Sequence, residues 1–128
     1  MTEPFDVDAD DWNAEVNQST MPVLVDFWHE FCVWCRRLDP VHAKLAGEFS
    51  SKLRFAKLDV LSSKQNNQIA VRYGVMGTPR LILFCDGRPI ETLVGHRPRE
   101  TLKRELQLMI ETYQECFKQQ TPLGKTDG

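Results

Sequence analysis

The sequence predicts an α/β fold with a central mixed β-sheet flanked by helices. Short apolar runs of strand length alternate with longer stretches whose apolar residues recur at helical spacing, which is typical of a βαβ unit. Two further short strands follow, separated by Asp86-Gly87, a dipeptide typical of a tight hairpin. A long amphipathic stretch then ends the pattern. The expected order is therefore a βαβ unit, a β-hairpin and a C-terminal helix.

Each element is predicted by its own local pattern. Aspartates within residues 8–11 cap a short helix that carries Trp12 and ends near residues 18–20. Residues 23–28 form an almost wholly apolar strand, as expected for a central strand covered on both faces. The remaining elements are a helix over 33–49, a strand over 53–60, a helix over 64–73, strands over 80–85 and 90–94, and a helix over 99–119.

Length and charge limit the possible functions. The chain of 128 residues fits a single domain, with a core over about residues 5–119 and a loose tail over 120–128. A formal net charge of -2 argues against nucleic acid or an anionic membrane as a partner. The N-terminus is acidic, unlike a signal peptide, and no apolar run has the length of a membrane span. We therefore expect a cytoplasmic protein.

The motif Cys32-Val33-Trp34-Cys35 lies between an apolar strand and a helix, which is the position of a dithiol redox site. Cysteines three positions apart on a first helical turn face the same side and can form a disulfide. The unpaired N–H groups and the dipole at the helix N-terminus stabilise a thiolate on Cys32. We therefore expect Cys32 to attack disulfides and Cys35, deeper in the helix, to resolve the mixed disulfide.

Two other uses of this cysteine pair are less consistent with the sequence. A structural zinc site needs four ligands, and the other cysteines, Cys85 and Cys116, stand far apart in sequence. A purely structural disulfide between Cys32 and Cys35 would close a very short loop and add little stability. In a reducing compartment Cys85 and Cys116 are expected to remain thiols outside the active site, with Cys116 acting as a small apolar residue. We expect no metal and no cofactor other than the redox disulfide.

Asp26 is a candidate proton acceptor. It lies within a strand that otherwise reads as core, and burial of a carboxylate disfavours its charged form, so its pKa should rise. Such a group can take the proton of Cys35, directly or through a water, when Cys35 attacks. Lys57, in the next strand, is its expected charged neighbour. The alternative is that Asp26 is solvated at a strand edge or forms an ordinary ion pair with Lys57.

The chain resembles the thioredoxin family. The resemblance covers about residues 5–109 and is carried by VLVDFWHEFCVWCRRLDPV (23–41), FAKLDV (55–60), YGVMGTPRLILFCDG (73–87) and the ETLVGH segment with Gly95. It implies a thioredoxin fold, with Cys32 as nucleophile, Cys35 as resolving thiol and Asp26 as buried acid. A proline at the start of a strand is usually trans. The resemblance implies instead a cis bond between Thr78 and Pro79, with Pro79 facing the disulfide.

The resemblance also implies how a substrate is held. The backbone of Thr78 is free to pair with an extended substrate segment, which is a form of β-augmentation. The expected substrate surface consists of residues around the cysteine pair and the Thr-Pro loop: Trp28, Phe31, Val33, Trp34, Thr78, Pro79 and Gly95.

Three residues depart from the usual thioredoxin pattern. Val33-Trp34 stands where the family usually has Gly-Pro, and Phe31 stands where it usually has tryptophan. These positions tune the redox potential, so an oxidising or isomerising role stays open. Arg36 and Arg37 either favour the Cys32 thiolate or form a solvated helix face. His29 either couples to Cys32 or is a surface histidine without a role.

The sequence therefore predicts a thioredoxin-type protein-disulfide reductase. Cys32 attacks a disulfide in a protein substrate, Cys35 resolves the mixed disulfide, and a thioredoxin reductase or another dithiol donor restores the pair. We expect a monomer. A thioredoxin-fold binding module or chaperone, which would use the apolar surface without turnover, is a further alternative, but retention of both cysteines and Asp26 argues against it.

Overall fold

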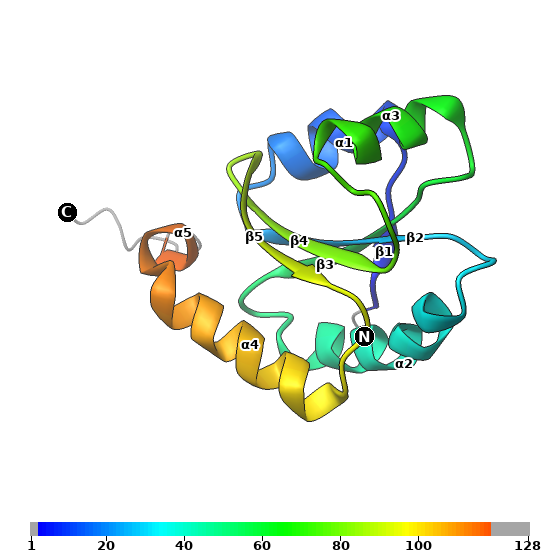
Figure 1. The fold of residues 1–128 in the computed structure, drawn as a ribbon. Coiled ribbons are helices and arrows are strands. Elements are labelled where there is room, and N and C mark those ends of the chain that lie inside the picture. Colours follow the sequence, from blue (N-terminus) through cyan, green and yellow to red (C-terminus); the bar gives the residue numbers. More distant parts are fainter. Residues whose placement is uncertain (1–2, 119–128) are drawn as a thin grey trace.

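The computed structural model describes residues 3–118 of the chain. No helix of this part is long and apolar enough to cross a membrane. In chain order the elements are β1 (Phe5–Asp6), α1 (Ala9–Trp12), the π-helical turn η1 (Asn13–Asn17), β2 (Val23–Trp28), α2 (Val33–Glu48), β3 (Arg54–Asp59), α3 (Lys64–Arg72), β4 (Arg80–Cys85), β5 (Arg88–Val94), α4 (Arg99–Thr112) and α5 (Gln114–Lys118) (Figure 1).

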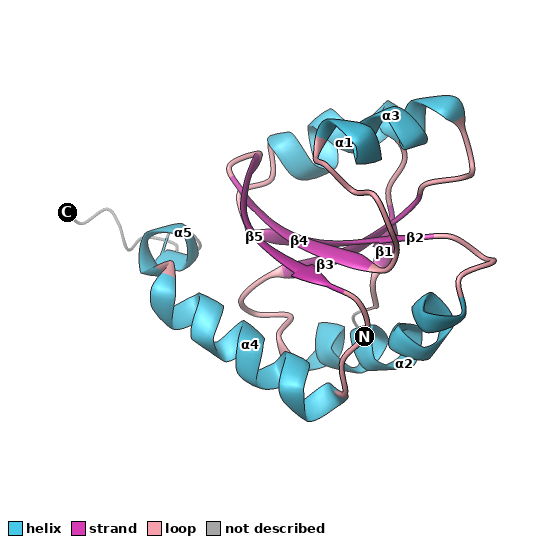
Figure 2. Cartoon of the chain, in the orientation of Figure 1, coloured by secondary structure: helices cyan, strands magenta, loops and turns pink. Residues whose placement is uncertain are grey.

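The strands form a five-stranded mixed sheet in the order β1-β3-β2-β4-β5. Strands β1, β3 and β2 are parallel, whereas β4 is antiparallel to both β2 and β5. Helices α1 and α3 cover one face of the sheet, and α2 and α4 cover the other (Figure 2). The predicted mixed sheet flanked by helices is thus confirmed, with β2 at its centre.

Strand β2 contributes to both faces of the sheet in alternation. Val23, Val25 and Phe27 belong to the apolar core under α1 and α3, whereas Leu24 belongs to the core under α2 and α4. Successive side chains of a strand point to opposite faces, so Asp26 lies on the same face as Leu24, under α2. The alternation therefore places this carboxylate beneath the helix that begins at the cysteine pair.

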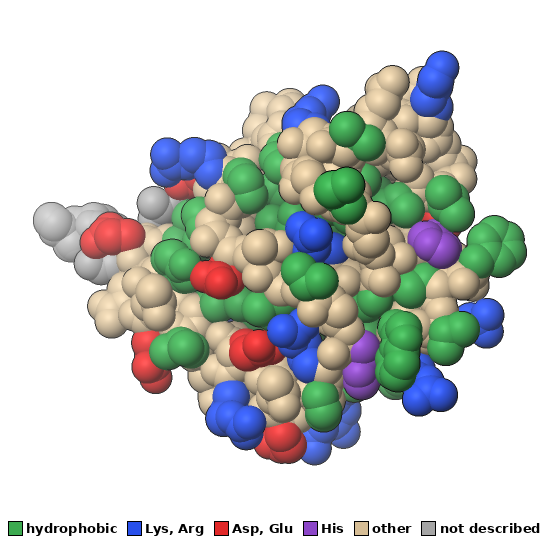
Figure 3. Space-filling model, viewed as in Figure 1, with side chains coloured by type: hydrophobic (Ala, Val, Ile, Leu, Met, Phe, Trp, Pro, Cys, Tyr) green, Lys and Arg blue, Asp and Glu red, His purple; other side chains and the backbone are tan. Residues whose placement is uncertain are grey.

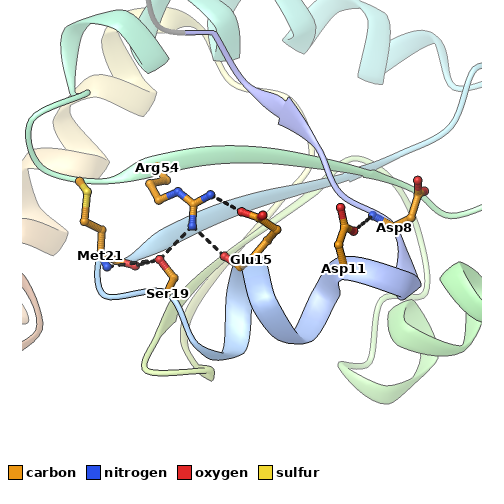
Figure 4. A network of polar contacts seen from close by, with 6 residues as sticks. All are labelled: Asp8, Asp11, Glu15, Ser19, Met21 and Arg54. Carbon is orange, nitrogen blue, oxygen red and sulfur yellow. Dashed lines mark hydrogen bonds and ion pairs between the residues drawn. The ribbon is translucent and has the colours of Figure 1, made fainter.

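A polar network fixes the chain just before β2 (Figure 4). Arg54, the first residue of β3, donates from Nη1 to the Glu15 carbonyl oxygen at 2.9 Å and to the Ser19 hydroxyl at 3.0 Å. The Ser19 hydroxyl donates in turn to the Met21 carbonyl oxygen at 2.7 Å. Since β3 pairs with β2, these bonds tie η1 and the segment before β2 to the sheet.

The β4–β5 hairpin turns at Asp86-Gly87, as predicted. Both residues have a positive φ, 54° and 78°, which is the conformation that a tight hairpin turn requires. A Cβ atom at Gly87 would lie 3.1 Å from the Asn17 backbone, so space as well as conformation favours glycine there. Strand β5 begins at Arg88, earlier than the predicted residue 90, because Arg88 still pairs with Cys85.

The prediction of one continuous helix over 99–119 is wrong. Tyr113 ends α4 with φ -108° and ψ 51°, and its hydroxyl donates to the Glu91 carboxylate on β5 at 2.6 Å. Helix α5 then turns Cys116 and Phe117 into the core under α2 and α4. Apolar residues keep their helical spacing through the break, so the sequence pattern did not reveal it. Residue 119 and the predicted tail over 120–128 lie outside the described residues.

Two further features differ from the sequence expectations. Strand β1 was not predicted, because Phe5–Asp6 is too short to show an alternating pattern. Cys85 and Cys116 form a disulfide with 6.0 Å between their Cα atoms, so the expectation that both stay thiols is wrong. The turn into α5 is what brings Cys116 to the end of β4. Cys116 is nevertheless buried in the core, as its expected apolar role requires.

Candidate active site

The Cys32–Cys35 disulfide lies at the N-terminus of α2. Its Cα atoms are 5.2 Å apart, within the range of ordinary disulfides. Cys32 is the N-cap residue with extended backbone, and its Sγ accepts the Cys35 backbone N–H at 3.1 Å. The first turn of a helix leaves its N–H groups without intrahelical partners, and here one of them is directed at sulfur. The same bond favours a thiolate on Cys32 once the disulfide is reduced.

The two sulfur-bearing residues differ in exposure. Cys35 is 3% exposed and packs toward the sheet, whereas Cys32 is half-buried at the rim of the helix. Another molecule can therefore reach Cys32 far more easily than Cys35. This asymmetry fits the predicted division into an attacking and a resolving sulfur.

Exposed apolar side chains surround the disulfide. Phe31, which is 72% exposed, precedes it, and Val33 and Trp34 project from the first turn of α2. Figure 3 shows hydrophobic side chains gathered with histidines at the edge of the molecule where β2 leads into α2. Met76, at 92% exposure, adds to the exposed apolar side chains from the loop before β4, and the sequence analysis did not single it out. Trp28, the last residue of β2, is half-buried.

Neighbouring side chains hold Trp34 and Phe31. The centre of the Trp34 ring lies 5.8 Å from the centre of the His96 ring. The guanidinium carbon of Arg37 lies 5.1 Å from the centre of the Trp34 ring, which is a cation–π contact. Arg37 therefore contacts the aromatic side chain of the motif, which the sequence left undecided. His29 accepts the Phe31 backbone N–H on Nδ1 at 3.2 Å, so its observed contact is with the turn before Cys32. His96 was not predicted as part of this surface.

The Thr78–Pro79 bond is cis, as the resemblance implied. Strand β4 starts at Arg80, which pairs with Phe27 near the end of β2, so Pro79 and the cysteine pair lie at the same end of the sheet. The Pro79 carbonyl oxygen accepts the Gly95 backbone N–H at 2.9 Å, and Gly95 has a φ of 87°, a conformation that favours glycine. This bond joins the start of β4 to the segment after β5.

Asp26 is a buried carboxylate without a hydrogen-bond partner among the described residues. It is 1% exposed, and both of its side-chain oxygens lack a partner there. Burial raises the pKa of Asp26 to about 7, while the positive charge of Lys57 lowers it and the negative charge of Asp39 raises it. The predicted rise is confirmed, and the alternative of a solvated strand edge or an ordinary ion pair with Lys57 does not fit this geometry.

Lys57 lies beside Asp26 but pairs with another acid. The two residues are register partners on β3 and β2, yet the Lys57 Nζ forms its ion pair with Asp39 of α2 at 2.5 Å. The same Nζ lies 4.6 Å from the Trp28 ring centre. Lys57 is thus the charged neighbour that the sequence predicted, although Asp39, which the sequence analysis missed, takes its hydrogen bond.

His42 is a second buried titratable group under α2. It lies seven residues after Cys35 on the same helix, which is two helical turns further along the same face. It is fully buried, its ring lies 5.2 Å from that of Phe55, and neither ring nitrogen has a hydrogen-bond partner among the described residues. Burial, with a smaller contribution from Lys57, lowers the pKa of His42 to about 3. A polar residue at a core-facing position of this helix was the only sequence signal for it.

Comparison with known proteins agrees with this geometry. The thioredoxin family model matches residues 3–108. The chain is 40% identical to a thioredoxin of Alicyclobacillus acidocaldarius over 70% of this chain and 82% of the relative, and 38% identical to a thioredoxin of Staphylococcus haemolyticus over 78% and 93%. It is also 34% identical to the chloroplastic thioredoxin M4 of Arabidopsis thaliana over 78% of this chain, but this match spans only 50% of that protein.

The matched region contains the whole site described above, including the disulfide at the start of α2 and the cis bond before β4. Thioredoxins are protein-disulfide reductases that use a redox-active disulfide and no external cofactor. The chain therefore belongs to the thioredoxin family and is a thiol–disulfide oxidoreductase with Cys32–Cys35 as its redox pair.

Proposed function

We propose that this protein is an electron carrier that reduces disulfides of protein substrates through a Cys32 nucleophile and a Cys35 resolving thiol. The observation that supports these roles most strongly is the pair's asymmetry: Cys32 is half-buried and accepts a helix N–H on its sulfur, whereas Cys35 is 3% exposed. The Cys32 thiolate attacks one substrate sulfur, a Cys32–substrate bond forms, and the other substrate sulfur leaves as a thiolate.

The second step releases the substrate. The Cys35 thiol loses its proton and attacks Cys32 Sγ, the mixed disulfide breaks, and the second substrate thiol leaves. Two electrons have then passed to the substrate, and the protein is left with the Cys32–Cys35 disulfide seen in the structure. A carboxylate with a pKa of about 7, buried under the helix that carries Cys35, is suited to accept that proton near neutral pH.

Lys57 and Asp39 set the charge around Asp26 in this proposal. Lys57 favours the ionised form of Asp26, and Asp39 opposes it. Lys57 thereby keeps the pKa of Asp26 close to neutral, where the carboxylate can both accept and release a proton. Both residues act through Asp26 and are positioning groups.

The substrate surface is proposed to combine apolar contact with backbone pairing. Trp28, Phe31, Val33 and Trp34 contribute the apolar part, and the Thr78 backbone before the cis-proline pairs with an extended substrate segment, with Gly95 beside it. The donor that restores the dithiol is a thioredoxin reductase or another dithiol protein. We further propose that residues 1–128 act as one domain and a monomer in the cytoplasm, and that neither nucleic acid nor a membrane is a partner.

Turnover tests the proposal directly. Dithiothreitol-driven reduction of a two-chain protein held by disulfides is followed for the native protein, for Cys32→Ser and for Cys35→Ser. We expect both single variants to fall to the uncatalysed rate, since turnover needs both sulfurs. The matched control is Cys85→Ser with Cys116→Ser, which removes the distant pair and should keep native turnover. Turnover that survives Cys32→Ser would contradict the proposal.

A further inference from the structure

The disulfide between Cys85 and Cys116 lies far from the redox pair. Cys85 ends β4, and the antiparallel register of β2 and β4 places it at the end of the sheet opposite to Trp28 and the Cys32–Cys35 pair. Figure 1 shows α5, which carries Cys116, and the start of α2 at opposite ends of the molecule. The disulfide joins residues 31 positions apart and fastens α5 to the β4–β5 turn.

The two sulfur-bearing residues of this disulfide differ in accessibility. Cys116 is 7% exposed and belongs to the core under α2 and α4, together with Phe117. Cys85 is half-buried at the rim of that core. An incoming thiol therefore meets less steric obstruction at Cys85, and Cys116 is the sulfur that leaves.

An open groove of about 570 Å³ borders this disulfide. Both cysteines line it, as do Asp86 and Glu111, and Arg88 is the one cation among the described lining residues. The carboxylates of Asp86 and Glu111 against the guanidinium of Arg88 leave these groups with a net negative charge, which attracts cationic ligands and repels anionic ones. A groove of this size accommodates a small molecule.

We propose that Cys85–Cys116 is a second thiol–disulfide exchange site, selective for small cationic thiols that react at Cys85. A thiolate attacks Cys85 Sγ, a bond forms between the two sulfurs, the Cys85–Cys116 bond breaks, and Cys116 leaves as a thiolate that takes up a proton. A second thiol molecule then attacks the sulfur of the first, releases a small symmetrical disulfide and leaves Cys85 reduced. Two electrons pass from the two small thiols to the protein.

This exchange is separate from the proposed reductase activity and can be tested without it. The full chain with Cys32→Ser and Cys35→Ser is treated briefly with cysteamine, quenched with acid, alkylated and digested with trypsin. Cys85 and Cys116 fall in different tryptic peptides, 81–99 and 105–118. We expect the cysteamine adduct on Cys85 and the alkyl group on Cys116. If the double variant does not fold, the same two peptides from the native chain show which cysteine carries the adduct.

Charge selectivity is the second readout. The rate at which cysteamine or 2-mercaptoethanesulfonate reduces the Cys85–Cys116 disulfide is divided by the rate at which the same thiol reduces hydroxyethyl disulfide. This ratio corrects for the intrinsic reactivity of each thiol. We expect the corrected cysteamine rate to be several-fold higher, and the preference to shrink at high salt because these charges are exposed. Glu111→Gln should reduce the preference, whereas Glu100→Gln, outside the groove on α4, should not.

Three results would overturn the proposal. The first is two free thiols at Cys85 and Cys116 in the oxidised protein, because no disulfide then exists to exchange. The second is an adduct on Cys116, which would reverse the order of accessibility. The third is an equal corrected rate for the cationic and the anionic thiol, which would remove the selectivity.

Discussion

Lys57 forms its ion pair with Asp39 on α2, at 2.5 Å, and not with Asp26, its register partner on the neighbouring strand. Asp26 is left buried without a hydrogen-bond partner among the described residues. Its charge is therefore compensated only at a distance, and burial dominates its pKa. The same three residues explain why a carboxylate in the core of this protein can exchange a proton near neutral pH.

Asp26→Asn should stabilise the protein and slow its reduction of disulfides. The pKa of Asp26 is raised from 3.8 to about 7 on folding, so ionisation costs stability that appears as pH rises above about 4 and levels off above about 7. The variant should gain roughly 4 kcal/mol at most near neutral pH and nothing at pH 3. Urea unfolding of the oxidised form across this range measures the gain, and disulfide reduction at pH 7 should fall. A variant that is less stable at pH 7 yet fully active would exclude the proposed role.

Asp39→Asn and Lys57→Met should shift the pKa of Asp26 in opposite directions. Removing the Asp39 charge lowers this pKa, because Asp39 opposes ionisation of Asp26, and removing the Lys57 charge raises it further. Carbon-13 NMR titration of the Asp26 carboxyl in the oxidised protein measures both shifts. Shifts of the same sign in the two variants would show that a structural change, and not charge, is responsible.

His42→Leu should protect the protein against acid. The pKa of His42 is lowered from 6.5 to about 3, so the unfolded chain binds this proton first, and stability is lost as pH falls from about 6.5 toward 3. Leucine has no such proton and fits the apolar surroundings. Urea unfolding measures the difference in free energy of unfolding between the variant and the native protein. We expect this difference to be roughly 3 kcal/mol larger, in favour of the variant, at pH 4.5 than at pH 7. A gap that is the same at both pH values would contradict this account of His42.

Replacing Val33-Trp34 by Gly-Pro should change the reduction potential without unfolding the protein. Both side chains are exposed, and the first turn of α2 tolerates proline because its N–H groups need no intrahelical partner. The change removes the contacts of Trp34 with His96 and Arg37. Equilibration with glutathione measures the potential, and thermal unfolding checks the fold. An unchanged potential would mean that Arg36, Arg37 or Asp26 sets it. A native value well above the cytosolic poise would favour the oxidising or isomerising alternative.

The sequence predicted those parts of the protein that depend on local pattern. The apolar alternation of β2, the Asp86-Gly87 turn and the helix that follows Cys32 each have a short-range signal, and the structure places them as predicted. The Cys32–Cys35 pair and the buried Asp26 could be assigned for the same reason. The cis bond before Pro79 has no local signal and could be expected only from the family resemblance.

Contacts between distant segments could not be predicted from these patterns. Asp39 lies on an exposed turn of α2 and gains its role from Lys57 on another element. Tyr113, where α4 ends, donates a hydrogen bond to Glu91 of β5, and Cys116, beyond this break, bonds to Cys85 at the end of β4. In each case the residue types are unremarkable, and only the fold brings the partners together.

Trapping the covalent intermediate tests the central claim most directly. Cys35→Ser and Cys32→Ser, each combined with Cys85→Ser and Cys116→Ser, leave a single cysteine apiece. Both are mixed with a protein that carries an exposed disulfide and analysed by intact-mass spectrometry. We predict that the chain with Cys32 alone accumulates a mixed disulfide, because it attacks and cannot be resolved, and that the chain with Cys35 alone forms essentially none. Accumulation on Cys35 and not on Cys32 would contradict the account.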